Sequence, residues 1–273
     1  GNQFLANIRE VDAIAHVLRC FDDGEIAHVD GDVDPLRDAT TVETELMLAD
    51  IDSLERRMTA LVKKSRGGDK EAKSDLVLME KLFAHLSEGR PARSTTGLTG
   101  EEIMRLPRLQ LLTAKPVLYV CNVSESDAPT GNAYCKLVAD KAVTEGAAYV
   151  IVSAAIESEI AQLDEADKIG FLSDLGLEEP GLARLIRAGY SLLGLVTFFT
   201  AGPKEARAWT VAAGSSAPEA AGVIHTDFQR GFIRAETIAY DDYINFKGES
   251  GAKEAGKLRI EGSDYKVVDG DVF

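Results

Sequence analysis

The sequence predicts an α/β fold with a parallel sheet, an inserted pair of antiparallel helices and a second, α+β domain. Residues 116–121 and 149–152 are short apolar runs rich in β-branched side chains, typical of parallel strands buried on both faces. Apolar residues at three- and four-residue spacing flank Gly67-Gly68, as expected of two packed helices. Beyond residue 195, strand-like segments surround one short helix, which predicts the second domain.

Composition limits the classes of protein to which this chain can belong. It has 273 residues, 45% hydrophobic and 27% charged, enough for roughly two or three domains with their own cores. No apolar run approaches the length of a membrane-spanning helix, and the start shows no secretory leader pattern, so we expect a cytoplasmic protein without membrane partners. The net charge of −15 argues against indiscriminate binding of nucleic acid, and we expect no DNA specificity. An RNA contact would require a local basic patch.

The first predicted elements are a short helix that ends near Glu10 and a buried strand over residues 13–21. His16 lies inside this strand, where a lone histidine is usually a core residue whose hydrogen bonds are satisfied. The acidic, turn-rich residues 22–38 predict a solvated loop in which Pro35 acts as a breaker. The acids of this loop lack the spacing of a calcium-binding loop.

From about Thr41 the apolar spacing becomes that of a coiled coil. The predicted seam residues are Met47, Ile51, Leu54, Met58 and Leu61 in the first helix and Ala72, Leu76, Met79, Phe83 and Leu86 in the second. Together they predict an antiparallel hairpin about 35 Å long. Five basic residues mark its tip, namely Lys63, Lys64, Arg66, Lys70 and Lys73. On an acidic protein they suggest a contact with RNA phosphates, and ordinary solvated lysines are the alternative.

The remaining elements of the first part are three helices. One is predicted over Asn132 to Glu145, between the two buried strands, and two amphipathic helices are predicted over residues 156–169 and 180–193. Residues 89–100 are rich in Gly, Pro, Ser and Thr and predict a loop.

The last part of the chain is predicted to form a small β-grasp module. Its expected strands cover residues 196–200, 206–211, 232–239 and 265–268, with a short helix around residues 218–221. Residues 269–273 have the pattern of a strand that has only begun, so we expect the C-terminus to be clipped.

The loops that follow the two buried strands carry the residues most indicative of function. Asn122-Val123-Ser124-Glu125 follows the first strand and Ser153-Ala154-Ala155 follows the second. Ligands bind at the carboxyl ends of parallel strands, and an Asn-x-x-acid loop paired with a Ser-Ala loop holds the purine base in GTPase-type P-loop proteins. In those loops an Asp accepts two hydrogen bonds from guanine. Glu125 is one methylene longer, which predicts a loss of guanine preference and tolerance of adenine; an ordinary turn is the alternative.

Three further features are weaker candidates for a site. The cysteines Cys20, Cys121 and Cys135 are odd in number and lack metal-ligand spacing, so they indicate reduced, mostly buried thiols. Residues 251–258 nearly match a phosphate-binding loop, but Leu258 replaces the Ser or Thr that holds Mg²⁺, and a helical turn is expected instead. His225-Thr226-Asp227 has no accompanying nucleophile and is expected to be structural.

The residues taken together resemble the YchF-type, Obg-like ATPases, a branch of the translation-factor class of P-loop proteins. The motifs that carry the resemblance span the chain: Gly1-Asn2-Gln3-Phe4-Leu5, His16-Val17-Leu18-Arg19-Cys20-Phe21, Gly67-Gly68-Asp69-Lys70, Asn122-Val123-Ser124-Glu125, Leu177-Glu178-Glu179-Pro180-Gly181-Leu182, Phe199-Thr200-Ala201-Gly202, Arg207-Ala208-Trp209-Thr210, His225-Thr226-Asp227-Phe228 and Gly231-Phe232-Ile233-Arg234-Ala235.

The resemblance implies a three-part organisation. Residues 1–40 and 111–193 would form a GTPase-like core, residues 41–110 a coiled-coil insertion and residues 194–273 a TGS domain. It also implies a ribosome-associated enzyme that binds ATP in preference to GTP and requires Mg²⁺. By match of motif, Asn122, Val123 and Glu125 would border adenine, with Ser153, Ala154 and Ala155 beside the base.

The chain departs from the family pattern at its start. Members of the family begin with a strand, a P-loop and an Asp-Ile-Ala-Gly switch segment, whereas this sequence begins directly after that switch. We therefore expect no catalytic and no metal-binding residue in this chain, and no ATP hydrolysis by this chain alone. Two other functions stay open: a non-catalytic RNA- or ribosome-binding adaptor that uses the hairpin and the TGS surface, and a redox-responsive regulator that uses Cys121 or Cys135.

Overall fold

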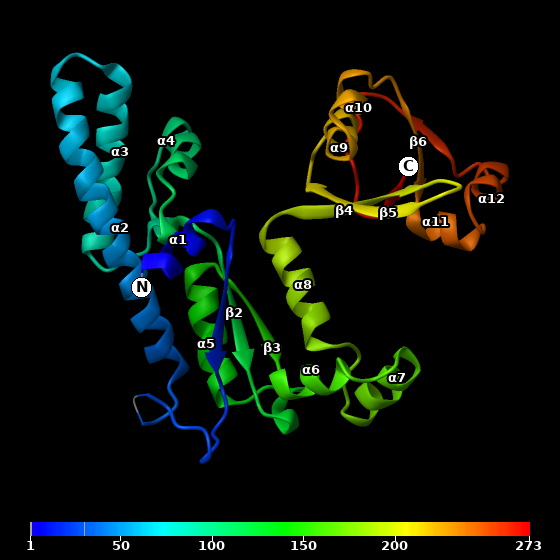
Figure 1. Ribbon diagram of the computed structural model, residues 1–273, viewed down its shortest axis with the longest axis horizontal. Helices are drawn as coiled ribbons and strands as arrows, with labels where there is room; N and C mark the ends of the chain where they lie inside the picture. Colours follow the sequence, from blue (N-terminus) through cyan, green and yellow to red (C-terminus); the bar gives the residue numbers. More distant parts are fainter. Residues whose placement is uncertain (1, 30) are drawn as a thin grey trace. The chain divides into compact units, whose positions relative to one another are not determined.

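The computed structural model describes residues 2–29 and 31–273, and it divides into two compact units (Figure 1). The first unit is Gly1–Gly189 and the second is Tyr190–Phe273.

A three-stranded parallel sheet forms the centre of the first unit. Its strands are β1 (Ile14–Arg19), β2 (Val117–Asn122) and β3 (Ala148–Val152), in the order β1-β2-β3. The register aligns Arg19 with Asn122 and Asn122 with Val152, so all three strands end at one edge (Figure 1). The first five residues of β2 are buried, as expected of a strand covered on both faces. The predicted parallel sheet is therefore confirmed.

Helix α5 (Ala133–Glu145) connects β2 to β3, as predicted. It begins because the Asn132 side chain accepts a hydrogen bond from the Cys135 backbone N–H, and it ends at Gly146, whose φ of 65° suits glycine. Val138 and Ala142 on this helix are fully buried against the sheet residues Leu18 and Tyr119.

Two long helices follow β1, and the role predicted for Pro35 is wrong. Helix α2 (Pro35–Arg66) begins at that proline, because a missing N–H costs nothing in the first turn of a helix. The Asp34 side chain caps the helix by accepting from the backbone N–H groups of Leu36 and Arg37. Helix α3 (Lys70–Ser87) runs back antiparallel to α2 (Figure 1), and Asp69 caps it in the same way.

The contact between α2 and α3 uses a wider stripe than the predicted seam. Most of the predicted seam residues lie in its apolar cluster, but Leu78 and Leu82 are fully buried there and were missed, while Leu76 is only half-buried. A 3.6-residue period spreads apolar contacts over neighbouring positions such as 78, 79, 82 and 86. The predicted start of the insertion, Thr41, lies within α2, and Ala39 packs into the core of the sheet.

Short helices complete the first unit. They are α1 (Asn2–Glu10), η1 (Ala92–Ser94), α4 (Gly100–Arg105), η2 (Leu106–Leu109), η3 (Leu112–Ala114), η4 (Glu125–Asp127), α6 (Ala154–Ile160), α7 (Glu165–Asp174) and α8 (Gly181–Leu192). The single helix predicted over 156–169 is wrong, because the backbone N–H groups of Gln162 and Leu163 bond to carbonyls three residues back and turn the chain before Asp164.

The second unit has a five-stranded mixed sheet of order β5-β4-β8-β6-β7. Its elements are β4 (Leu195–Ala201), β5 (Ala206–Ala212), α9 (Ala217–Ile224), α10 (Thr226–Arg230), β6 (Ala235–Ala239), α11 (Tyr240–Asn245), α12 (Glu249–Glu254), β7 (Arg259–Glu261) and β8 (Asp271–Val272). The predicted hairpin of β4 and β5 is confirmed. The helical turn expected in place of a phosphate-binding loop is α12.

The closing strand predicted over 265–268 is wrong. Only an isolated bridge joins Lys266 to Ser216, and the closing strand is β8, parallel to β4 and antiparallel to β6. Asp271 determines this placement: its buried carboxylate accepts from the Tyr265 hydroxyl at 2.7 Å, the Arg259 guanidinium at 3.1 Å and the Val268 backbone N–H at 2.9 Å.

A buried carboxylate holds helix α2 to the segment that leads into β2. Asp50 is fully buried and accepts hydrogen bonds from the backbone N–H groups of Leu112 and Thr113 and from the Thr113 hydroxyl, all at 2.8 Å. Burial raises the pKa of the Asp50 carboxyl, and the three hydrogen bonds oppose that shift. The segment that leads into β2 is therefore held to the middle of α2.

Replacing this carboxylate is expected to weaken the first unit. Asp50→Ala leaves two backbone N–H groups buried without an acceptor, which should lower the free energy of unfolding by about 2–3 kcal/mol. Urea unfolding followed by circular dichroism measures the change, and hydrogen exchange at Leu112 and Thr113 localises it. Asp52→Ala, an exposed position on the same helix, is the control and should stay within about 0.5 kcal/mol of the parent. Equal stabilities for both variants would contradict this role of Asp50.

Candidate functional site

The two loops singled out in the sequence lie side by side at the carboxyl edge of the three-stranded sheet. Asn122 ends β2 and Ser153 follows β3, and the register pairs Asn122 with Val152. The Val123 backbone N–H extends this pairing by donating to the Val152 carbonyl at 2.9 Å. Open parallel sheets bind ligands at this edge.

The Asn122 side chain joins the two loops directly. Its Oδ1 atom accepts a hydrogen bond from the backbone N–H of Ala154 at 3.0 Å, and Ala154 is the first residue of α6. Because Asn122 is half-buried, solvent competes only in part for this bond. The amide therefore sets the position of one loop relative to the other.

The residues of the two loops differ in what they present to a ligand. Glu125, Ala154 and Ala155 are exposed, whereas Val123 is 3% and Ser153 2% exposed. The Val123 side chain belongs to the apolar core and supports the loop from below. The Ser153 hydroxyl is buried, and within the described part of the chain it has no hydrogen-bond partner.

A third segment, which the sequence reasoning missed, fixes the loop that contains Glu125. The Asn132 side-chain amide donates to the Cys20 carbonyl and to the Asp127 carboxylate, both at 2.8 Å. Gly131 has a φ of +71°, and a Cβ atom there would lie 2.8 Å from the Ile151 Cδ1 atom. The Asn before a helical pattern was the available signal, because it is a typical N-cap.

His16 is half-buried in β1, with its ring centroid 6.0 Å from that of Tyr119. It lines an apolar cavity of about 110 Å³, and burial lowers the pKa of its imidazole. The Tyr119 hydroxyl donates to the Glu145 carboxylate at 2.7 Å, and Arg93 and Lys141 pair with acids beside it. Burial and this hydrogen bond raise the pKa of the Tyr119 hydroxyl. The cluster is a structural link between β2, α5 and the start of α2.

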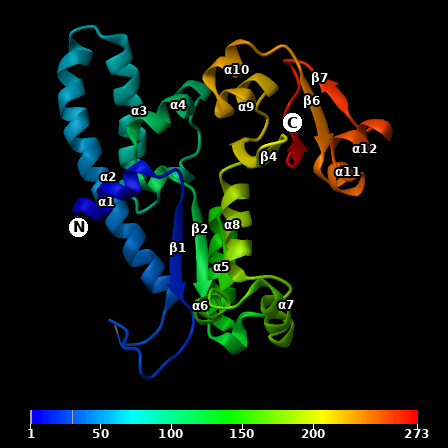
Figure 2. The same cartoon turned by 45° about the vertical axis from the view of Figure 1, so that its right-hand side comes forward.

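The five basic residues of the predicted tip are all exposed. They lie in the last turn of α2 and the first turns of α3, at the end of the helical pair that is remote from the three-stranded sheet (Figures 1 and 2). The φ of Gly68, +91°, allows the turn between them.

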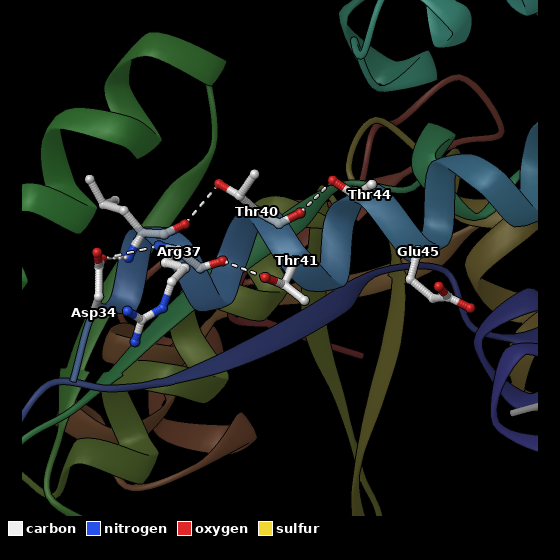
Figure 3. Close-up of a pocket in the computed structure, with 7 residues that line it drawn as sticks. Asp34, Arg37, Thr40, Thr41, Thr44 and Glu45 are labelled. Atoms are coloured by element: carbon white, nitrogen blue, oxygen red, sulfur yellow. Dashed lines mark hydrogen bonds between the residues drawn. The ribbon is translucent and has the colours of Figure 1, made fainter. Parts of the chain in front are cut away.

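Two other candidates are structural. A broad, open hollow of about 600 Å³ runs along the first turns of α2 (Figure 3), but the hydroxyls of Thr40, Thr41 and Thr44 each donate to the carbonyl four residues back. In the second unit, the His225 Nδ1 atom accepts from the Asp227 backbone N–H at 3.2 Å and so caps α10.

The three cysteines are all buried, and the structure brings their sulfur atoms together although their sequence spacing does not suggest it. The hydrogen bond with Cys20 and burial raise the pKa of the Cys121 thiol, and burial raises that of Cys135. Protonated thiols react slowly with oxidants, which disfavours the redox hypothesis. None of the helices in the described ranges combines the length and apolar character needed to cross a bilayer.

Comparison with known proteins places these features in a family. Residues 195–273 match the family model YchF-GTPase_C, described as a protein of unknown function (DUF933). The chain is 58% identical over 273 residues to the ribosome-binding ATPase YchF of Haemophilus influenzae and 52% identical to that of Escherichia coli O157:H7. Each alignment covers 100% of this chain and 75% of the relative.

A solved structure agrees with the sequence comparison. The YchF GTPase of Schizosaccharomyces pombe is 36% identical, with a TM-score of 0.86 over 100% of this chain and 74% of that chain. The resemblance inferred from the motifs is thus confirmed over the whole sequence. The chain belongs to the YchF family.

Proposed function

We propose that this chain supplies the base-binding part of a ribosome-associated ATPase and that the base lies against the loops after β2 and β3. The observation that carries the proposal is the hydrogen bond from Ala154 N–H to Asn122 Oδ1, which joins these two loops where parallel sheets bind ligands. The bacterial relatives are named ribosome-binding ATPases, which supports the ribosome association and the ATPase activity in this proposal.

Adenine is the preferred base in this proposal. The Asp of a guanine-binding loop accepts from two guanine donors at once, and adenine lacks that pair of donors. Glu125 is exposed at this position and is one methylene longer, so its carboxylate fits the guanine fork poorly. Val123 takes the place of the usual Lys, so this position has no long side chain to reach the edge of the base. The Val123 side chain is itself buried.

The phosphates and Mg²⁺ are assigned to residues other than those of this chain. The alignment with the Haemophilus influenzae relative covers 75% of that protein, and we place the phosphate-binding loop in the part of the relative that lies outside the alignment. ATP hydrolysis, with Mg²⁺ neutralising phosphate charge, is therefore proposed for the whole protein rather than for these residues alone.

Loosening the two loops should weaken nucleotide binding. The substitution Asn122→Ala, made in the full-length protein, removes the hydrogen bond from the Ala154 N–H. If the binding free energy of ATP falls by about 1.4 kcal/mol, the Kd for ATP rises roughly tenfold. Isothermal titration calorimetry measures the Kd for ATP and for GTP. Ser126→Ala, an exposed neighbour, is the matched control and should bind as the parent does. An unchanged Kd in the Asn122 variant would contradict the assignment of the base to these loops.

The second candidate function is a non-catalytic adaptor that binds RNA or the ribosome, and the basic tip is the observation that favours it. Five exposed basic residues cluster around one turn of a protein whose net charge is −15. We assign α2 and α3 to a coiled-coil insertion and the second unit to a TGS domain of the β-grasp type. An adaptor would bind the ribosome equally with and without nucleotide, whereas a nucleotide-controlled ATPase would not.

Charge reversal at the tip should weaken ribosome binding. Replacing Lys63, Lys64 and Arg66 with Glu introduces repulsion against RNA phosphates, so co-sedimentation with 70S ribosomes should fall by about tenfold or more at low salt. The matched control replaces Lys81, Arg90 and Lys136, which are exposed in the first unit away from the tip, with Glu for the same change in net charge. If both triple variants co-sediment equally, the tip is not the contact.

A further inference from the structure

Three cysteines from distant parts of the sequence converge below the loop that contains Asn122. Cys20 follows β1, Cys121 lies in β2 and Cys135 lies in the first turn of α5. Their sulfur atoms all lie within 4.8 Å of one another. Cys20 and Cys121 are fully buried, and Cys135 is 4% exposed.

The fold holds this arrangement from several sides. The backbone N–H of Cys20 donates to the Asn122 carbonyl at 2.8 Å, which continues the pairing of β1 with β2. Asn132 holds two of the three cysteines: its amide donates to the Cys20 carbonyl, and its Oδ1 atom accepts from the Cys135 N–H at 3.2 Å. A Cβ atom at Gly131 would meet the Cys135 Cβ at 3.2 Å, so glycine there lets the chain approach closely. The three sulfurs are thus brought together before any ion binds.

We propose that Cys20, Cys121 and Cys135 form a three-sulfur site for a soft monovalent metal ion, Cu(I). Sulfur ligands select soft ions such as Cu(I) and Zn²⁺. A structural zinc ion takes four ligands, whereas the described residues bring three ligand atoms together here, and burial keeps out a water molecule as the fourth. Three sulfurs in a plane at about 2.3 Å from a central ion lie about 4.0 Å apart, within the spacing in the structure.

Coordination at this site is an exchange of protons for an ion, without a change in oxidation state. Each thiol that coordinates Cu(I) forms a Cu–S bond and releases its proton to solvent. The apparent affinity for Cu(I) should therefore rise with pH through the neutral range.

The site adjoins the loops assigned to the nucleotide base, but its chemistry does not depend on that assignment. Cys121 directly precedes Asn122, and the ion would link the ends of β1 and β2 to α5. Binding to the folded state alone stabilises it by mass action. The temperature of unfolding should therefore rise when Cu(I) is added.

A competition titration tests the proposal. The reduced protein is titrated with Cu(I) under anaerobic conditions against a chromophoric Cu(I) chelator, and X-ray absorption then reports the ligands. The expected result is one Cu(I) ion per chain bound by three sulfurs. Cys135→Ser should leave two sulfurs and weaken binding by about tenfold or more, since loss of even an outer-shell partner has an effect of that size.

Two controls separate coordination from folding and from surface binding. Val138→Ala makes a packing defect in the same core cluster but keeps all three thiols, so it should bind Cu(I) as the parent does. Replacing all three cysteines with Ala should abolish binding. Failure of the parent protein to compete with the chelator, fewer than three sulfurs around its bound ion, or equal binding by the triple variant would overturn the proposal. The measurements on the parent decide it even if a variant does not fold.

Discussion

The pairing of β2 with a parallel strand on each side determines where the candidate base-binding loops and the cysteine cluster lie. Because β2 is buried along its length, its register with β1 and β3 is set by the core, and all three strands end together. Asn122 consequently meets Ala154, and Cys121 meets Cys20. A slip of one residue would move Tyr119 and Cys121 to the opposite face of the sheet and misalign the two loops.

Helix α2 connects the sheet to the basic tip of the helical pair. Its first turns pack on the sheet through Ala39, its middle is held by Asp50, and its last turn carries Lys63, Lys64 and Arg66. A rigid helix of 32 residues spans about 48 Å. One continuous helix therefore joins the sheet to the basic tip.

Local sequence patterns predicted the elements that are set by interactions between residues close together in the sequence. The apolar runs of β2 and β3, the α5 helix and the β4–β5 hairpin follow from periodicity and turn residues. One error had a local cause, because Asp34 directly before Pro35 is an N-cap signal that marks a helix start. The position of β8 depends instead on tertiary contacts of Asp271 with Tyr265 and Arg259. The cysteine cluster joins Cys20 to residues more than a hundred positions later in the sequence, so a search for closely spaced metal ligands does not detect it. The Asn-x-x-acid motif likewise does not indicate that Val123 is buried.

The account depends most on the placement of the base against the loops after β2 and β3. Two-dimensional ¹H–¹⁵N NMR of the protein during titration with ATP and with GTP tests this placement directly. We expect ATP to shift the Asn122 side-chain amide and the backbone amides of Glu125, Ala154 and Ala155, and equal amounts of GTP to shift them less. Shifts confined to other parts of the chain, or larger shifts with GTP, would contradict the account.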